Sequence, residues 1–182
     1  MYTYLLSCFH RTKHNNFTDA DLADIQIMKN QLYNHRVCRF NYTTYDMRRD
    51  QDSINPNTRS DVMLLSEDTN HCYWYARVVF IFHAFVRYQR SNPQRIDLLF
   101  VRWYTLDLNH KAGFTAKRLY RIGFVDGRES DPFDFINPAH VIRAVHLIPA
   151  FALGKTHRLL SASTARRENE EDTDYEYYYV NM

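Results

Sequence analysis

The sequence lacks any apolar stretch long enough to cross a membrane. Its most hydrophobic run, residues 78–86, is bracketed by Arg77 and Arg87, whereas a membrane helix needs about 18 or more consecutive apolar residues. Residues 1–10 also lack the basic segment and the apolar length of a secretory signal. We therefore expect an intracellular protein of the nucleus or cytoplasm that has no membrane partner.

Glycine and cysteine are scarce. The 182 residues include 4 glycines and 3 cysteines, and Cys8, Cys38 and Cys72 show no pairing rhythm, so reduced thiols are expected rather than a disulfide framework. Aromatic residues are abundant instead, with 14 Tyr and 12 Phe, and such flat, stiff side chains favour strands. The composition predicts one β or α+β domain.

One helix is predicted from about residue 18 to residue 34. It begins at Thr18, because an N-cap hydroxyl followed by an acid three residues later is typical of a capping box. Apolar residues then recur at helical spacing and form a stripe that faces a partner surface. The stripe consists of Leu22, Ile25, Met28 and Leu32.

Antiparallel strands are predicted between about residues 37 and 148. Residues 37–45 alternate in polarity like a strand, and the polar stretch 48–60 is interpreted as a surface loop. Residues 73–88 are too many for one typical strand, so a bent or bulged strand is expected there. Residues 95–106 should pair with it as a hairpin.

These elements predict the α+β fold class. We expect an N-terminal helix packed on a twisted antiparallel sheet or a small, partly open β-barrel. Residues 1–160 should form a single domain. Residues 161–182 are predicted to be a solvated acidic tail, in which 175–180 is a candidate edge strand.

Four segments resemble a signature of proteins from mushroom-forming fungi. They are residues 42–56, 73–78, 101–104 and 141–151. Many of those proteins look like carboxy-terminal parts of transposases of the Kyakuja-Dileera-Zisupton type. A looser similarity, through the order of an aromatic strand, a Val-Arg-Trp strand and an Asp-Pro-Phe turn, links the chain to the β-domain after plant CACTA-type transposases. The resemblance implies a transposon-derived, non-catalytic, β-rich region and assigns no functional residues.

Basic residues are concentrated in the middle of the chain. Residues 77–128 hold ten Lys and Arg against three Asp and Glu, and such a charge excess attracts phosphates. Together with the family resemblance, it suggests a non-catalytic module that binds DNA or chromatin through a basic sheet face. The residues predicted to make this contact are Arg77, Arg87, Arg90, Arg102, Lys117, Arg118 and Arg121.

The same hypothesis assigns the aromatic and basic side chains of the central strands to opposite sides of the sheet. Because alternate residues of a strand face opposite ways, Trp74 and Trp103 are expected in the core. Arg77, Arg87 and Arg102 would then face solvent.

Two other functions remain open on the sequence alone. A protein-interaction or assembly module would use the helical stripe or the terminal Tyr-rich strand, and a metal-dependent nuclease would use Asp50 and Asp52. Residues of the types that bind zinc also occur, namely His35, Cys38, His71 and Cys72. Adjacent strand residues point to opposite faces, however, which argues against a shared site at 71 and 72. We expect no enzyme activity, no metal and no cofactor.

Overall fold

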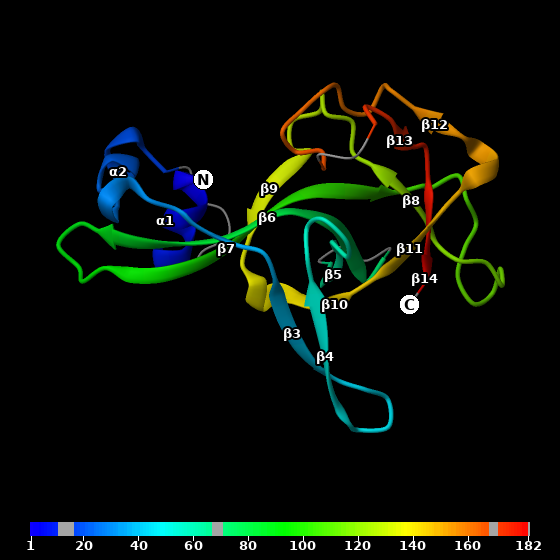
Figure 1. The fold of residues 1–182 in the computed structure, drawn as a ribbon, viewed down its shortest axis with the longest axis horizontal. Helices are drawn as coiled ribbons and strands as arrows, with labels where there is room; N and C mark the ends of the chain where they lie inside the picture. The colour runs from blue at the N-terminus through cyan, green and yellow to red at the C-terminus, as the bar shows by residue number, and fades with distance from the viewer. Residues whose placement is uncertain (11–16, 67–70, 168–170, 182) are drawn as a thin grey trace.

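The computed structural model describes residues 1–10, 17–66, 71–167 and 171–181, and strands dominate it (Figure 1). Residues 168–170 of the predicted acidic tail lie outside this range. The helices are α1 (Tyr2–His10) and α2 (Asp19–Ala23), with 3-10 turns η1 (Met28–Asn30), η2 (Pro138–His140) and η3 (Phe151–Leu153). The strands are β1 (Ile25–Ile27), β2 (Tyr33–His35), β3 (Cys38–Thr43), β4 (Arg49–Ile54), β5 (Asp61–Leu65), β6 (Tyr73–Tyr88), β7 (Gln94–Leu106), β8 (Arg121–Phe124), β9 (Phe133–Ile136), β10 (Val141–Ala144), β11 (His146–Pro149), β12 (Lys155–Thr156), β13 (Asp174–Tyr175) and β14 (Tyr178–Asn181).

Ten of the strands form one antiparallel sheet with the order β10-β5-β6-β7-β8-β14-β11, to which β1, β2 and β9 add as side branches. Only Val145 separates β10 from β11, so consecutive strands of the chain lie at the two ends of this order. Two further hairpins, β3–β4 and β12–β13, complete the fold. The predicted class is confirmed: a short N-terminal helix packs on a twisted antiparallel sheet, which is open rather than a closed barrel.

The β6–β7 hairpin contains the two longest strands and runs from one end of the molecule through its centre (Figure 1). The predicted irregularity is present as a register shift between Val78 and Phe80. The helices α1 and α2 lie at one end of the hairpin, and β8, β11 and β14 gather at the other (Figure 1). No helix among the described residues is long and apolar enough to span a membrane.

The helix predicted over residues 18–34 is wrong beyond its first turn. The capping box is confirmed, because the Thr18 side chain accepts from the Asp21 N–H and the Asp21 carboxylate accepts from the Thr18 N–H. The helix nevertheless ends at Ala23, and Ile25 enters the core as β1 pairs with β6. Lys29 then has a φ of 56°, which lies outside the right-handed α-helical region. Burial against β6 has overridden the helical periodicity.

The N-terminal helix of the fold is α1, which the sequence did not predict. Its Leu5 and Leu6 side chains are fully buried and pack with Phe82 and Leu98 of the central hairpin. A nine-residue helix is too short to be stable in isolation. It forms here because the sheet covers its apolar face.

The predicted edge strand near the C-terminus is wrong in position. Strand β14 lies between β8 and β11, and its Tyr178 and Val180 side chains are buried. The C-terminal segment is therefore part of the sheet and not a strand added at its edge.

A buried ion pair fastens this segment to the sheet. Arg102 of β7 donates two hydrogen bonds to Asp174, at 3.1 Å and 3.0 Å, and both residues are less than 5% exposed. Arg166 donates to the same carboxylate. One aspartate thus serves two arginines that have little access to water.

We expect Asp174→Ala to lower the free energy of unfolding by about 3–5 kcal/mol, because it leaves buried guanidinium groups without a counter-charge. Chemical denaturation measures the loss. The matched control is Asp97→Ala, which breaks an exposed ion pair with Arg95 and should cost much less. Equal losses in the two variants would contradict a structural role for the buried pair.

Candidate nucleic-acid interface

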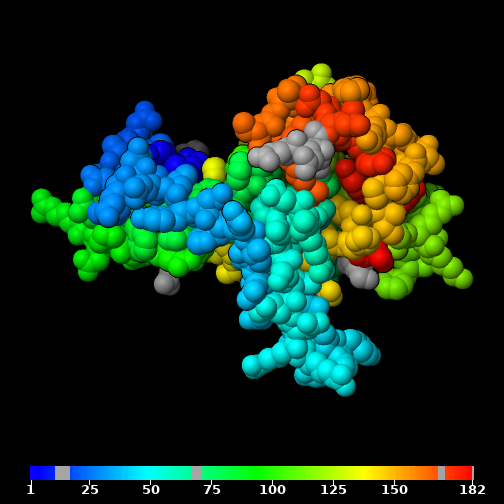
Figure 2. Space-filling model, viewed as in Figure 1, coloured from blue at the N-terminus to red at the C-terminus, as the bar shows by residue number. Residues whose placement is uncertain are grey.

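The β3–β4 hairpin, which we call the arm, projects from the body of the molecule (Figures 1 and 2). Its two strands pair without a register shift from Cys38 opposite Ile54 to Thr43 opposite Arg49. Six residues at roughly 3.3 Å each give strands about 20 Å long. The sequence predicted a loop over residues 48–60, so the second strand of the arm is a correction.

The inner face of the arm attaches it to the sheet. Phe40 and Ile54 are buried and pack with Val62, Ala144 and other apolar side chains of the core. Because side chains of a strand alternate between faces, this contact fixes which residues the arm presents to solvent.

The outer face of the arm is entirely polar and carries no carboxylate. All six side chains on this face are exposed. The amide of Gln51 donates to the side-chain oxygen of Asn41 across the two strands, at 2.8 Å. The outer-face residues are Arg39, Asn41 and Thr43 on β3 and Arg49, Gln51 and Ser53 on β4.

The outer face carries two arginines, Arg39 and Arg49. Among the described residues, no carboxylate lies within ion-pair distance of Arg39 or Arg49. The acids of the arm are engaged elsewhere: Asp50 accepts a hydrogen bond from the Tyr42 hydroxyl, and Asp52 is buried beside two other arginines. The outer face is therefore positive although the whole arm is nearly neutral.

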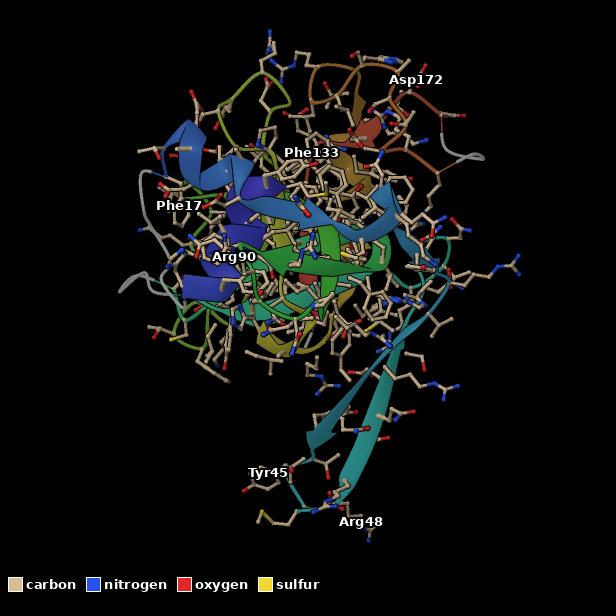
Figure 3. The ribbon with its side chains drawn as sticks, turned by 90° about the vertical axis from the view of Figure 1, so that its left-hand side faces the viewer. Phe17, Tyr45, Arg48, Arg90, Phe133 and Asp172 are labelled. Carbon is tan, nitrogen blue, oxygen red and sulfur yellow. The ribbon has the colours of Figure 1, made fainter. Side chains whose placement is uncertain are left out.

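The tip of the arm exposes side chains that proteins use for contacts. Tyr45 and Met47 are almost fully exposed, and Figure 3 shows Tyr45 and Arg48 at the far end of the arm. The backbone of the tip is held by hydrogen bonds between Thr44 and Arg48, and Arg48 pairs with Asp46 at 3.0 Å.

The seven residues predicted to bind nucleic acid do not form one surface. Arg77 and Arg102 are a correction, since Arg77 is only partly exposed and pairs with Asp61, and Arg102 is buried and pairs with Asp174. Arg121 is paired with Asp107. The positions of the other four are given next.

Only part of the remaining set is freely exposed. Arg87 is half-buried and donates to the Gln26 side chain. Arg90 is exposed in the β6–β7 turn, labelled in Figure 3, whereas Lys117 and Arg118 are exposed in the connection from β7 to β8 at the opposite end of the molecule (Figure 1). The predicted basic sheet face is therefore absent from the described surface.

Of the two tryptophans expected in the core, Trp74 is a correction, whereas Trp103 packs in part against the core. Trp74 is 46% exposed and Tyr75 is buried, whereas Trp103 is partly buried and lies 6.0 Å from Trp74 between ring centroids. The side that carries Tyr75 is covered by the C-terminal strands, which pack Tyr178 and Val180 against it. The rings of Tyr and Phe therefore fill this part of the core in place of tryptophan.

The surfaces predicted for a protein partner are also dispersed. Of the predicted helical stripe, Ile25 is buried in β1 and Leu32 is exposed beyond the η1 turn. The terminal Tyr-rich strand is an interior strand. Among the described residues, no group of three or more His, Cys, Asp or Glu side chains is placed to hold a metal ion.

A second cluster of polar and aromatic residues lies on β2 and β6. The Nε2 atom of His35 is 2.6 Å from Nδ1 of His83, and Tyr33 stacks on His83 with ring centroids 4.8 Å apart. Burial lowers the pKa of His83, and the charges of Arg95 and His35 lower it further, while Asp97 opposes them. Cross-strand packing has produced this histidine pair from residues 48 positions apart.

Comparisons of the chain with protein-family models, with curated proteins and with solved structures found no match. The resemblance to transposon-encoded proteins therefore stays a prediction from the segments that carry it. What the arm can bind follows from its own geometry and charge.

The histidine pair predicts a pH-dependent stability. Because the fold lowers the pKa of His83, its contribution is complete above the unfolded-state value near 6.5 and is lost as the pH falls below that value. We expect the wild type to lose more stability between neutral pH and about pH 5 than His83→Gln does. Denaturation at both pH values measures this, with the exposed His140→Gln as control. An identical pH dependence in His83→Gln and wild type would contradict the prediction.

Proposed function

We propose that this chain binds double-stranded nucleic acid, with the arm lying in a groove of the duplex. The observation that carries the proposal is the outer face of the arm, which is exposed, polar and free of carboxylates, and whose Arg39 and Arg49 form no ion pair with the residues that the structure describes. The resemblance to transposon-encoded proteins, which by itself assigns no activity, is compatible with a module of this kind. The basic surface is now assigned to the arm in place of the sheet face.

The shape of the arm fits a groove. The major groove of B-form DNA is about 12 Å wide and admits a two-stranded β-ribbon. The arm is such a ribbon, with paired strands roughly 4.8 Å apart and about 20 Å long. The arm projects from the body (Figure 2), and the residues of its outer face are exposed.

The side chains on the outer face match the chemistry of base edges and phosphates. Arginine donates to guanine O6 and N7, asparagine and glutamine form paired hydrogen bonds with adenine, and a threonine methyl group contacts thymine. The cross-strand contact holds Gln51 and Asn41 side by side. The exposed Arg36 and Arg48 flank the face at the base and tip of the arm, where phosphates would border the groove.

A duplex fits this face better than a single strand does. Proteins that bind single strands present aromatic rings on which the bases stack, whereas the six outer-face residues include no ring. The exposed ring of Tyr45 is at the tip of the arm. An arm that enters a groove is therefore the arrangement that uses the polar face along its full length.

We expect the double variant Arg39→Ala and Arg49→Ala to bind a short fluorescent DNA duplex at least about tenfold more weakly than the wild type. Each arginine that neutralises a phosphate contributes about 0.9 to the slope of log affinity against log salt, and a base contact contributes affinity with little change in slope. Fluorescence anisotropy at several salt concentrations measures both quantities. Both side chains are exposed, so the fold should tolerate the change.

The matched control is the double variant Arg90→Ala and Lys117→Ala, which removes two exposed cations far from the arm. It should change the affinity much less. A larger loss in the control than in the arm variant would place the interface elsewhere. The absence of duplex affinity in the wild type at low salt would contradict the proposed function.

A further inference from the structure

A small pocket lies at the base of the arm. It has a volume of about 200 Å³ and is open on one side. The pocket is lined by Arg59, Met63, Arg143, Ala144, Val145, His146 and Asn181. Its polar side chains therefore come from the connection between β4 and β5, from β10 and β11, and from the end of β14.

Asp52 on the inner face of the arm positions the two arginines of the pocket. One carboxylate oxygen is 3.1 Å from Arg59 and the other is 3.6 Å from Arg143. The second oxygen also accepts a hydrogen bond from the backbone N–H of Ala144. Asp52 is buried, whereas the arginine side chains are 52% and 40% exposed. Asp52 thus holds both guanidinium groups close to each other, and both remain partly exposed to solvent.

The geometry leaves this pocket with hydrogen-bond donors and positive charge in excess. Each guanidinium has five N–H donors, and the single carboxylate between them satisfies only some of these. The ring of Tyr42 packs under Arg143, 4.5 Å from the guanidinium carbon to the ring centroid, which restrains that side chain. His146 and Asn181, opposite each other on β11 and β14, add further polar groups.

We propose that this pocket binds a phosphate group between Arg59 and Arg143. Guanidinium groups recognise phosphate oxygens through two parallel N–H donors, and two guanidiniums from different elements suit a tetrahedral anion with several oxygens. The inference rests on the proposed function in one respect. An arm in a groove brings its base to the phosphate backbone that forms the edge of the groove.

The same chemistry would also recognise a free phosphate or the phosphate of a mononucleotide. The two sources differ in what the arm contributes. A backbone phosphate is bound together with the duplex, so removal of the contact between the pocket and that phosphate should change the salt dependence of duplex binding. A free phosphate is bound by the pocket alone, so changes on the outer face of the arm should not affect it.

The test uses the full chain with Arg59→Gln and Arg143→Gln as separate variants. Single replacements leave Asp52 one arginine partner, so the buried carboxylate is not stranded. Inorganic phosphate is titrated in while the arginine and histidine resonances are followed by NMR, and thermal unfolding checks that each variant is folded. The exposed Arg128→Gln, distant in sequence and paired with Asp126, is the matched control.

We expect phosphate to shift the pocket resonances of the wild type and to bind each pocket variant at least about threefold more weakly. Each variant should also lower the salt slope of duplex binding by about one. The control should change neither quantity. Unchanged phosphate and duplex binding in both pocket variants would overturn the pocket proposal.

The two proposals fail in different ways. If the arm variants lose duplex affinity while the pocket variants behave as wild type, the pocket is not a phosphate site and the proposed function stands. If phosphate shifts the pocket resonances but no duplex binds at low salt, the pocket takes a free phosphate and the arm does not bind a duplex.

Discussion

The buried contact between Arg102 and Asp174 is the constraint on which the arrangement of the sheet depends. It joins the centre of β7 to a residue 72 positions later in the chain, and it holds the segment that leads into β14. The ring of Phe124 lies 3.8 Å from the Arg102 guanidinium carbon and 4.9 Å from that of Arg77. A charged pair costs free energy to bury unless its hydrogen bonds are satisfied, and here the Asp174 carboxylate accepts hydrogen bonds from both Arg102 and Arg166. The C-terminal segment is therefore fixed in one position on the sheet.

This internal use of charge explains why a basic composition does not produce a basic sheet face. Arg77 and Arg102 lie opposite each other on β6 and β7, and each has its own carboxylate in the interior, Asp61 and Asp174. Interior acids come from distant parts of the chain, so a local count of basic residues cannot anticipate them. Arginines without such a partner remain available to a ligand. On the arm, Arg39 and Arg49 lie on the outer face, whereas Asp50 and Asp52 lie on the inner face.

The sequence predicted those elements whose pattern agrees with their final environment. The long run of β6 with its bulge and the hairpin with β7 were recognisable locally. The prediction failed where contacts with residues far away in the sequence determine the secondary structure. Ile25 reads as helical by its spacing but pairs with Tyr88 in the sheet. Residues 49–54 were predicted as a loop because nearly all of them are polar, so their sequence shows no alternation of polar and apolar residues. Their pairing with β3 makes them a strand. The sequence therefore did not predict the arm.

Because its side chains alternate between two faces, strand β4 both anchors the arm and forms part of its outer face. Asp50, Asp52 and Ile54 face the inner side of β4, where Asp52 joins the arginines at the base of the arm, while Arg49, Gln51 and Ser53 face solvent. A shift of one residue in register would exchange the two sets. It would put acids on the outer face, expose Ile54, and place Gln51 or Ser53 at the buried position of Asp52, where a polar group without a partner costs free energy. Burial of Ile54 and the hydrogen bond from Ala144 to Asp52 oppose that shift. The contacts that anchor the arm are therefore the same contacts that keep its outer face free of acids.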